Sequence, residues 1–179
     1  MVTTIAHAEM QTPVGALHLF GAEHGLLTIT LPNESRMAGE TRLRRAETVR
    51  GNTHVHVTDD ESPLAQALEQ LHAWFEGGRR DFDLPLAPRG TPFQLAVWEA
   101  VAAVPWGVTC SYAEIARQIG KPVAVRAVGA ANGANPLPLI IPCHRVIGSN
   151  GSLTGYGGGL PLKQQLLAWE RGQATLGGG

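Results

Sequence analysis

The sequence has few cysteines and no long hydrophobic run, and both absences narrow the classes of protein it can encode. Two cysteines in 179 residues cannot form a disulfide framework or a four-thiolate zinc site. No stretch approaches the roughly 20 consecutive apolar residues that a membrane-spanning helix needs. The first ten residues, MVTTIAHAEM, lack the basic start and the apolar run of a secretion signal. We therefore expect a cytoplasmic protein with both thiols free.

Charge is also scarce, and its distribution is uneven. Charged residues make up 16% of the chain and the net charge is −1. Residues 1–90 carry 8 Lys and Arg against 12 Asp and Glu, a net charge of −4, whereas residues 91–179 carry 6 against 3, a net charge of +3. This asymmetry permits a polyanionic partner for the C-terminal half without requiring one. The length predicts one or two domains, each with its own core.

The N-terminal third is typical of β-structure. Between Met10 and Leu31, the runs GALHLF and GLLTITL are separated by Ala22-Glu23-His24-Gly25, which predicts a hairpin. Residues 32–60 are polar and aperiodic, and we interpret them as a loop with one further strand around residues 53–57.

A helix and a linker complete the first half. Ser62 is the expected cap and Pro63 the first helical residue, followed by an apolar stripe of Leu64, Leu68, Leu71 and Phe75 that Gly77-Gly78 ends. Residues 81–86 could form a last short strand. Pro85 and Pro88 then indicate a linker and a domain boundary near Arg89-Gly90.

The second half is predicted to be mainly helical. Thr91 and Pro92 open a helix with Phe93, Val97 and Val104 at helical spacing. Ser111 and Glu114 form a capping box for the next helix, and a third helical segment holds Val125, Val128 and Ala131. Two short helices joined by a glycine-containing turn indicate a helix-turn-helix, although many helical hairpins bind nothing.

The remainder contains the densest motif of the chain. Residues 137–141 are an apolar run that we expect to be extended and buried, and they lead into Pro142-Cys143-His144-Arg145-Val146. Residues 148–159 are glycine-rich and predict a shaped loop. Residues 160–169 are predicted to form an amphipathic final helix, and the tail from residue 172 to 179 is expected to be frayed.

Cys143 is the first candidate for chemistry. A lone cysteine in an apolar run is most often a small buried hydrophobe. Against that interpretation, His144 is adjacent and Arg145 adds positive charge that favours a thiolate. Glu170 could orient the imidazole, or it could be a solvated acid at a helix end, paired with Arg171.

Other candidates also have two interpretations. Arg126 stands among small residues in the second helix of the pair and could enter a groove of DNA, or it could simply extend along the surface. Tyr112 follows the helix cap, either with a free hydroxyl or packed half-buried. Cys110 is interpreted as structural. His54 and His56 share a strand face but have no third ligand nearby, so we expect no metal site.

These residues resemble a known family. NPLPLIIPCHRVIG, preceded by SYAEIARQIG and RAVGAANGANP and followed by LTGYGGG and LLAWE, is similar to the O6-alkylguanine-DNA alkyltransferases. The likeness is dense from residue 90 to residue 170. It implies an α+β fold with a small ribonuclease-H-like N-terminal domain over residues 1–89, a mainly helical DNA-binding alkyltransferase domain over residues 90–172, and a flexible tail over residues 173–179.

The resemblance implies a single-turnover transfer of an alkyl group from O6-alkylguanine, with O4-alkylthymine left open, to Cys143. His144 would deprotonate the thiol through a water, Glu170 would orient His144, Tyr112 would protonate the departing guanine and Asn135 would brace the turn before the active-site strand. The implied DNA-binding residues are Ser111, Arg126, Ala127, Gly129 and Arg145. The implied pocket residues are Pro138, Val146, Tyr156, Gly157 and Gly158.

The resemblance further implies duplex DNA as partner, no cofactor, no metal, no membrane and a monomer. The chain departs from some relatives in having Gly157 where they have serine, and in having no cysteine before Cys110 that could bind zinc in the N-terminal domain.

Three other functions compete: a non-catalytic binder of alkylated DNA, a helix-turn-helix regulator with an incidental cysteine, and a cysteine hydrolase. The intact Cys143 disfavours the binder, and the short chain offers a regulator no dimerisation segment. A hydrolase would lack an evident oxyanion device.

Overall fold

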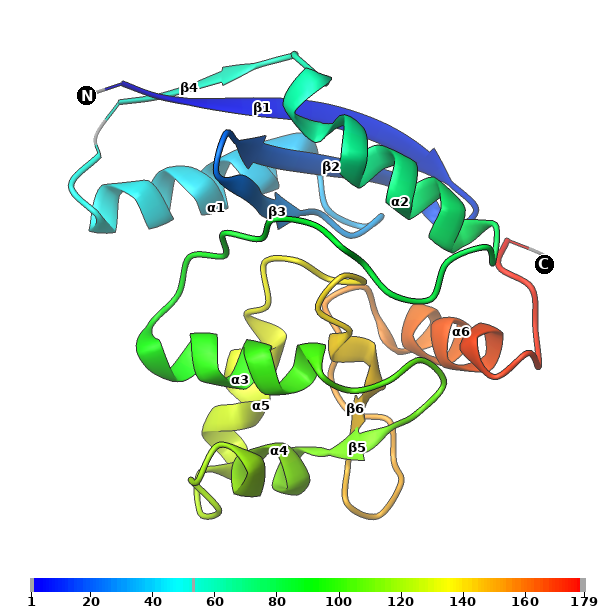
Figure 1. Cartoon of the computed structure of the whole chain (residues 1–179). Coiled ribbons are helices and arrows are strands. Elements are labelled where there is room, and N and C mark those ends of the chain that lie inside the picture. Colours follow the sequence, from blue (N-terminus) through cyan, green and yellow to red (C-terminus); the bar gives the residue numbers. More distant parts are fainter. Residues whose placement is uncertain (1, 53, 178–179) are drawn as a thin grey trace. The chain divides into compact units, whose positions relative to one another are not determined.

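The computed structural model describes residues 2–52 and 54–177. The chain divides into two compact units, Met1–Arg89 and Gly90–Gly179 (Figure 1). Strands and helices are mixed in both units, as the expected α+β class requires. In the part of the chain that is described, no helix is long and apolar enough to cross a membrane.

The N-terminal unit is built on a four-stranded sheet in the order β3-β2-β1-β4. Its strands are β1 (Val2–Thr12), β2 (Gly15–Ala22), β3 (Gly25–Ile29) and β4 (His54–Thr58). The predicted hairpin is confirmed, because β2 and β3 pair antiparallel across Glu23 and His24. We did not predict β1, which pairs antiparallel with β2 and parallel with β4. The further strand expected around residues 53–57 corresponds to β4, although residue 53 lies outside the described residues.

Helix α1 (Arg36–Val49) overturns the interpretation of residues 32–60 as mainly loop. The side chain of Ser35 caps it by accepting a hydrogen bond from the Ala38 amide. Its buried residues are Gly39, Leu43 and Glu47, of which only one is a large hydrophobe. No apolar stripe therefore marks this helix in the sequence.

Helix α1 has a glycine, Gly39, at the point where it packs closely against the sheet. A Cβ atom on Gly39 would lie 2.5 Å from the ring of Phe20, which is fully buried. Leu43 packs in the same cluster as Ile5, Phe20 and Leu27. Contact with the sheet is made through this close approach rather than through a row of large side chains.

The helix predicted from Ser62 begins differently. Residues Ser62–Leu64 form a 3-10 helix, η1, and α2 (Ala65–Phe75) follows it. Neither start has a side-chain cap, so the capping role expected of Ser62 is wrong. Residues 81–86 are not a strand either, apart from a single parallel bridge between Leu26 and Leu86. The Gln70 carboxamide instead binds the Asp83 backbone, with an amide donor at 2.8 Å and an oxygen acceptor at 2.9 Å.

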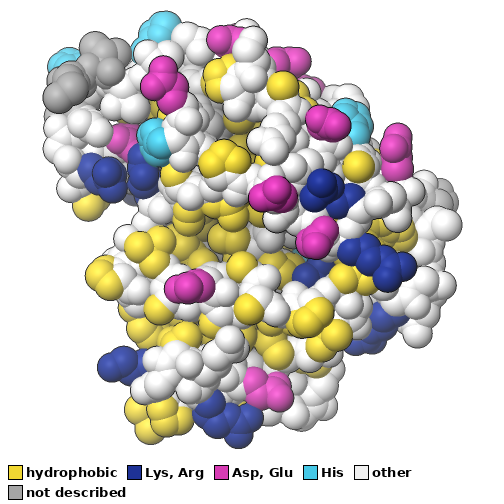
Figure 2. Space-filling model, in the orientation of Figure 1, with side chains coloured by type: hydrophobic (Ala, Val, Ile, Leu, Met, Phe, Trp, Pro, Cys, Tyr) yellow, Lys and Arg dark blue, Asp and Glu magenta, His cyan; other side chains and the backbone are white. Residues whose placement is uncertain are grey.

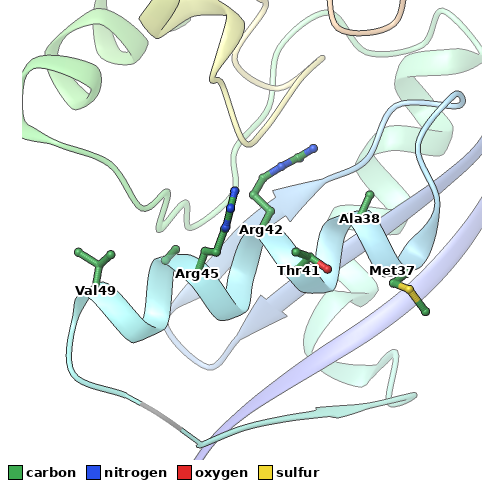
Figure 3. Close-up of a pocket in the computed structure, with 7 residues that line it drawn as sticks. Met37, Ala38, Thr41, Arg42, Arg45 and Val49 are labelled. Carbon is green, nitrogen blue, oxygen red and sulfur yellow. The ribbon is translucent and has the colours of Figure 1, made fainter.

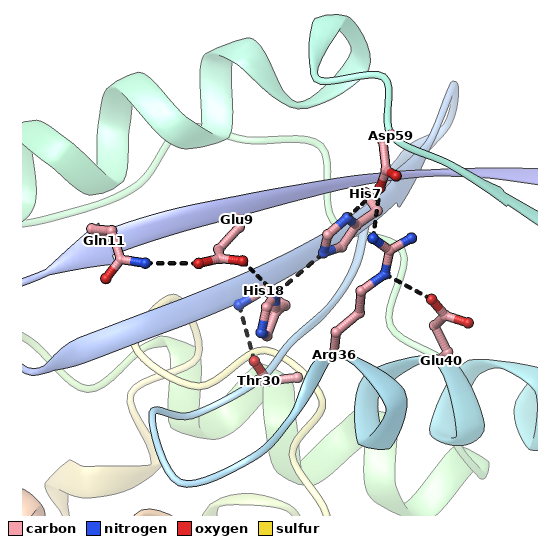
Figure 4. A network of polar contacts seen from close by, with 8 residues as sticks. All are labelled: His7, Glu9, Gln11, His18, Thr30, Arg36, Glu40 and Asp59. Carbon is pink, nitrogen blue, oxygen red and sulfur yellow. Dashed lines mark hydrogen bonds and ion pairs between the residues drawn. The ribbon is translucent and has the colours of Figure 1, made fainter.

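A polar network joins β1 and β2 to α1 (Figure 4). His7 Nδ1 lies 2.8 Å from Asp59, and His7 Nε2 lies 3.2 Å from His18 Nδ1. Arg36 on α1 binds both Asp59 and Glu40 at 2.9 Å. Burial lowers the pKa of His18 despite the nearby Glu9 carboxylate. These contacts are internal to the N-terminal unit.

The C-terminal unit is mainly helical, with two short strands. Its elements are α3 (Pro92–Ala102), β5 (Cys110–Ser111), α4 (Tyr112–Gln118), α5 (Val125–Gly133), the 3-10 helix η2 (Cys143–Arg145), β6 (Val146–Ile147) and α6 (Leu160–Glu170). Thr91 with Gln94, and Ser111 with Glu114, form reciprocal capping boxes at α3 and α4. Helices α3, α4 and α5 pack against one another, and α4 and α5 form the predicted helix-turn-helix.

The run before the cysteine is buried but not extended. Leu137 to Ile141 turns, because the Ile141 amide donates to the Leu137 carbonyl at 2.8 Å and Leu139 has a φ of +73°. A left-handed backbone at a leucine is uncommon and needs support from its surroundings. Cys143 accordingly opens a 3-10 helix and does not end a strand, which corrects the expectation of an active-site strand.

Candidate active site

Cys143 lies in the interior of the C-terminal unit, at the first position of η2, and is 6% exposed. Its carbonyl accepts a hydrogen bond of 3.3 Å from the side-chain amide of Asn132, which belongs to α5. The second helix of the helix-turn-helix is therefore tied directly to the cysteine segment. Cys143 and Cys110 are both free thiols.

Asn135 organises the turn that precedes the cysteine. Its Nδ2 donates to the Ile141 carbonyl at 2.8 Å and its Oδ1 accepts from the Leu137 amide at 2.9 Å. One side chain thus holds both ends of the turn that contains the strained Leu139. Asn135 also hydrogen-bonds the Cys143 side chain.

His144 and Glu170 form a fully buried pair. The imidazole Nε2 lies 2.8 Å from Glu170 Oε1, and both side chains are inaccessible to solvent. Glu170 ends α6, and its carboxylate also accepts from the Gly107 amide at 3.1 Å. The alternative of a solvated acid paired with Arg171 is therefore wrong.

The protonation states of this pair follow from burial and hydrogen bonding. Burial opposes the charge on Glu170, but hydrogen bonds from His144 and Arg145 outweigh it and lower the pKa of the carboxyl to about 2. Burial, together with the charges of Arg145 and Lys163, lowers the pKa of His144 despite the opposing effect of Glu170, so the imidazole is neutral at neutral pH. A carboxylate can only accept, so Nε2 carries the ring proton and Nδ1 is left with a lone pair. Nδ1 has no hydrogen-bond partner among the described residues.

The contacts of Arg145 contradict the two roles expected from the sequence, DNA binding and stabilisation of the thiolate. Its guanidinium binds Glu170 with Nε at 2.9 Å and Nη2 at 2.8 Å, and Nη1 donates to the Val104 carbonyl at 2.6 Å. It is 5% exposed, and Glu170 balances its charge. We therefore withdraw Arg145 both as a DNA-binding residue and as the cation that favours the thiolate, because its donors face inward.

The cation that acts on Cys143 is Lys163, which sequence reasoning missed. Burial raises the pKa of the Cys143 thiol, while the Asn135 hydrogen bond and the Lys163 charge oppose that rise. Lys163 projects from α6, twenty residues along the chain, and is itself fully buried. A lysine in an amphipathic helix carries no signal of burial, since it is the residue expected on the solvent face.

Tyrosines and the glycine-rich loop lie close to this centre. The hydroxyl of Tyr156 is buried and has no hydrogen-bond partner among the described residues. Burial, together with the charges of Cys143 and Glu170, raises the pKa of Tyr156. The Tyr112 hydroxyl is not free, because it donates to the Thr154 carbonyl at 3.3 Å. Pro138 and Val146 are buried, and Gly157 and Gly158 follow Tyr156 in the loop.

Helix α5 presents a small-residue surface. Arg126 and Ala127 are exposed, whereas Val128, Ala131 and Asn132 face the interior. Gly129 faces the ring of Tyr112, to which a Cβ atom would come within 3.9 Å. Ser111 is occupied by the capping box with Glu114.

The N-terminal unit contains none of the predicted site residues. An open surface hollow of about 590 Å³ runs along α1 (Figure 3), lined by Met37, Ala38, Thr41, Arg42, Arg45, Ala46 and Val49. Among the described residues of either unit, no three His, Cys, Asp or Glu side chains are placed to hold a metal ion. The predicted site residues therefore all belong to the C-terminal unit.

The fold and the site together define a thiol-centred protein with a helix-turn-helix. Two family models match the chain: the ribonuclease-like domain of 6-O-methylguanine DNA methyltransferase over residues 5–88, and the DNA-binding domain of the same family over residues 92–172. The chain therefore belongs to the 6-O-methylguanine DNA methyltransferase family.

Individual relatives are similar over nearly the whole length. The methylated-DNA–protein-cysteine methyltransferase of Mycobacterium bovis is 44% identical over 95% of this chain and 94% of its own. The constitutive enzyme of Bacillus subtilis is 44% identical over 90% and 92%. A crystal structure of the Mycobacterium tuberculosis protein in complex with DNA has a TM-score of 0.79 at 41% identity and covers 97% of this chain and 96% of that one.

Proposed function

We propose that the protein repairs DNA by direct reversal, taking the alkyl group of O6-alkylguanine in duplex DNA onto Cys143 once per molecule. The observation that carries this proposal is the buried Cys143, His144 and Glu170 arrangement in a chain of the methyltransferase family. The complex of the M. tuberculosis relative with DNA supports DNA as the partner.

The chemistry is a displacement at carbon. The Cys143 sulfur forms a bond to the alkyl carbon while the bond from that carbon to O6 breaks, and the guanine takes the electron pair and then a proton. The product is a thioether, which water does not hydrolyse as it does an acyl link. Each protein molecule therefore reacts once, and no cofactor takes part.

His144 acts as the base through a water molecule. Its neutral state and its unprotonated Nδ1 suit it to accept the thiol proton, and the Glu170 carboxylate stabilises the imidazolium that results. Asn135 acts by holding the turn in place and by hydrogen-bonding the sulfur. Tyr112 would give up its 3.3 Å contact with Thr154 and donate to the departing guanine.

The target base must leave the duplex to reach a thiol that is 6% exposed. Extrusion of a base costs a few kcal/mol, and less for a damaged base that pairs poorly. Arg126 would fill the gap it leaves, with Ser111, Ala127 and Gly129 close to the DNA backbone. Pro138 and the loop residues Tyr156, Gly157 and Gly158 would wall the base pocket, and the backbone groups of Cys143 and Val146 would recognise the guanine.

The same proposal includes an oligomeric state, a monomer, and a cellular compartment, the cytoplasm. One unit holds the whole Cys143, His144 and Glu170 arrangement, so a monomer suffices for transfer. A free thiol is required, which suits a reducing cytoplasm.

The test is a stoichiometric reaction between the protein and a duplex oligonucleotide that contains one O6-methylguanine. We expect the protein to gain the mass of one methylene group, with no further transfer when substrate is in excess. The Cys143→Ala variant should bind the duplex but transfer nothing. Repeated turnover would indicate a hydrolase, and binding without a mass change in the unaltered protein would indicate a non-catalytic binder. Either result would refute the proposal.

A further inference from the structure

Lys163 is an unusual residue for the interior of this unit. Its side chain is fully buried, and it is the only lysine of the chain besides Lys121. Among the described residues, no carboxylate forms an ion pair with it. A buried ammonium without an acidic partner is costly, and the protein must gain something from holding it there.

The contacts of Lys163 place it at the junction of the site. Its Nζ donates to the Val146 carbonyl at 2.6 Å and to the Thr154 carbonyl at 2.8 Å. It also lies 5.9 Å from the centre of the Tyr112 ring. Val146 follows η2 directly and Thr154 lies in the glycine-rich loop, so one ammonium joins the cysteine segment to that loop.

Carbonyl oxygens hydrogen-bond the ammonium but do not neutralise it. The titratable groups coupled electrostatically to Lys163 are the Cys143 thiol and the His144 imidazole, and the Tyr112 ring lies beside its ammonium. The charge of Lys163 on α6 favours the Cys143 thiolate, whereas the charge of that thiolate opposes ionisation of Tyr156 in the loop. The two other charges of the centre, Arg145 and Glu170, bind each other.

We propose that the Lys163 ammonium is the counter-charge of the Cys143 thiolate and a positioning residue for alkyl transfer. This inference depends on the proposed function in one respect only, namely that the thiolate is the nucleophile in alkyl transfer. When the thiol loses its proton to His144, the sulfur becomes a buried anion, and the imidazolium then shares the Glu170 carboxylate with Arg145. Lys163 is the cation of the site that has no carboxylate partner among the described residues. Lys163 then acquires the anionic partner that it otherwise lacks, and the transfer step starts from a stabilised nucleophile.

The charges of the two groups are coupled, and such coupling is reciprocal. Lys163 must favour the Cys143 thiolate by as much as the thiolate favours the protonated Lys163. A lysine that only braces the two carbonyls would be insensitive to the ionisation of the sulfur. The pair can therefore be tested from either side.

The first measurement is the lysine side-chain NMR titration of the full chain with labelled lysine, which gives one signal for Lys163 and one for Lys121. We expect the midpoint of Lys163 to fall by about one pH unit in Cys143→Ala relative to the unaltered protein. The exposed Lys121 is the internal control and should not move. An unchanged Lys163 midpoint would overturn the proposal.

The second measurement is the rate at which iodoacetamide alkylates Cys143 as a function of pH, with peptide mass spectrometry to exclude reaction at Cys110. In K163M, we expect the curve to move to higher pH and the rate at neutral pH to fall about tenfold, as for a one-unit shift. K163R keeps the charge and should restore the position of the curve, and K121M should match the unaltered protein. If the alkylation rate of K163M were lower at every pH but the midpoint of the curve were unchanged, Lys163 would have only a structural role and the proposal would be refuted.

Both measurements are independent of DNA. If the unaltered protein took no methyl group from the oligonucleotide, the proposed function would fail, while these titrations would still decide the role of Lys163. If K163M did not fold, the NMR titration would decide it alone, because it leaves Lys163 in place.

Discussion

At the scale of single residues, the site depends on Glu170 more than on any other carboxylate. It accepts hydrogen bonds from the buried side chains of His144 and Arg145 and from the half-buried Gly107 amide. Removing one member of such a set leaves the remaining groups buried and unpaired. Its loss therefore affects both stability and reactivity.

We expect Glu170→Gln to lower the free energy of unfolding by about 3–5 kcal/mol, the usual cost of breaking a buried ion pair from one side. Methyl transfer should also slow, because the imidazolium loses its stabilising charge. Urea denaturation and single-turnover kinetics measure the two effects. Glu99→Gln is the matched control, because Glu99 is exposed on α3 and should change neither quantity. A Glu170→Gln variant as stable as the control would contradict this assignment.

The same carboxylate predicts a pH dependence. Its pKa is near 2 in the folded protein and 4.5 ordinarily, so the unfolded chain binds the proton more tightly. The stabilisation is thus complete above pH 4.5 and is lost as the pH falls through the folded pKa near 2, by about 3 kcal/mol in total. Unfolding measured across this acid range should show a steeper loss in the unaltered protein than in Glu170→Gln. Parallel curves would show that the carboxyl titrates normally.

The site residues differ in how far the sequence could reveal them. His144 follows Cys143 directly, and Glu170 was one of only three acids after residue 90, so scarcity pointed to it. Arg145 was assigned wrongly because adjacency in sequence does not show where a side chain points. Lys163 could not be found, since its burial depends on how α6 packs beside Thr154 and Val146.

At the scale of elements, helices with local signals were predictable and helices without them were not. Helices α3 and α4 begin with capping boxes that are visible in the sequence. Helix α1 has a serine cap but no apolar stripe, because its contact with the sheet is made by Gly39 and Leu43. The apolar run at residues 137–141 lies between prolines and is too short for a helix, which predicts an extended segment rather than the turn that forms. Asn135 and tertiary burial override the preference.

The close approach of α1 to the sheet predicts a change in stability opposite to the one that helix propensity predicts. An alanine in place of a helical glycine ordinarily stabilises by about 1 kcal/mol. At Gly39, the added Cβ would lie 2.5 Å from the buried Phe20 ring, so we expect Gly39→Ala to destabilise by about 1–3 kcal/mol. Gly133→Ala, where nothing lies within 4 Å, is the control and should not destabilise. Thermal or urea unfolding compares them, and a stabilised Gly39→Ala would refute the close contact.

Helix α5 gives a prediction about DNA. If Arg126 fills the gap left by the extruded base, Arg126→Ala should slow repair of duplex DNA about tenfold, or about 1.4 kcal/mol in the barrier. Reaction with free O6-methylguanine should be unchanged, because no gap has to be filled. Arg171→Ala, which removes another exposed arginine, serves as control. Equal losses on duplex and free base would reject the role of Arg126.

At the scale of the whole molecule, charge and chemistry are divided between the units. The acidic side chains visible in Figure 2 lie mostly over the N-terminal unit, which agrees with the 12 acids before residue 91 and the 3 after it. The C-terminal unit holds the helix-turn-helix and Cys143, together with the His144, Lys163 and Glu170 side chains. A polyanionic partner therefore meets less repulsion from the unit that carries the reactive cysteine.

The central claim is that one sulfur atom, that of Cys143, receives the alkyl group. Peptide mass mapping after reaction with methylated duplex tests it most directly, because the chain has only one other thiol, Cys110, whose pKa burial and the Glu114 charge raise to about 11. The account predicts that the methyl group is found on the peptide that contains Cys143 and on no other. A methyl group on Cys110, or on any residue besides Cys143, would contradict it.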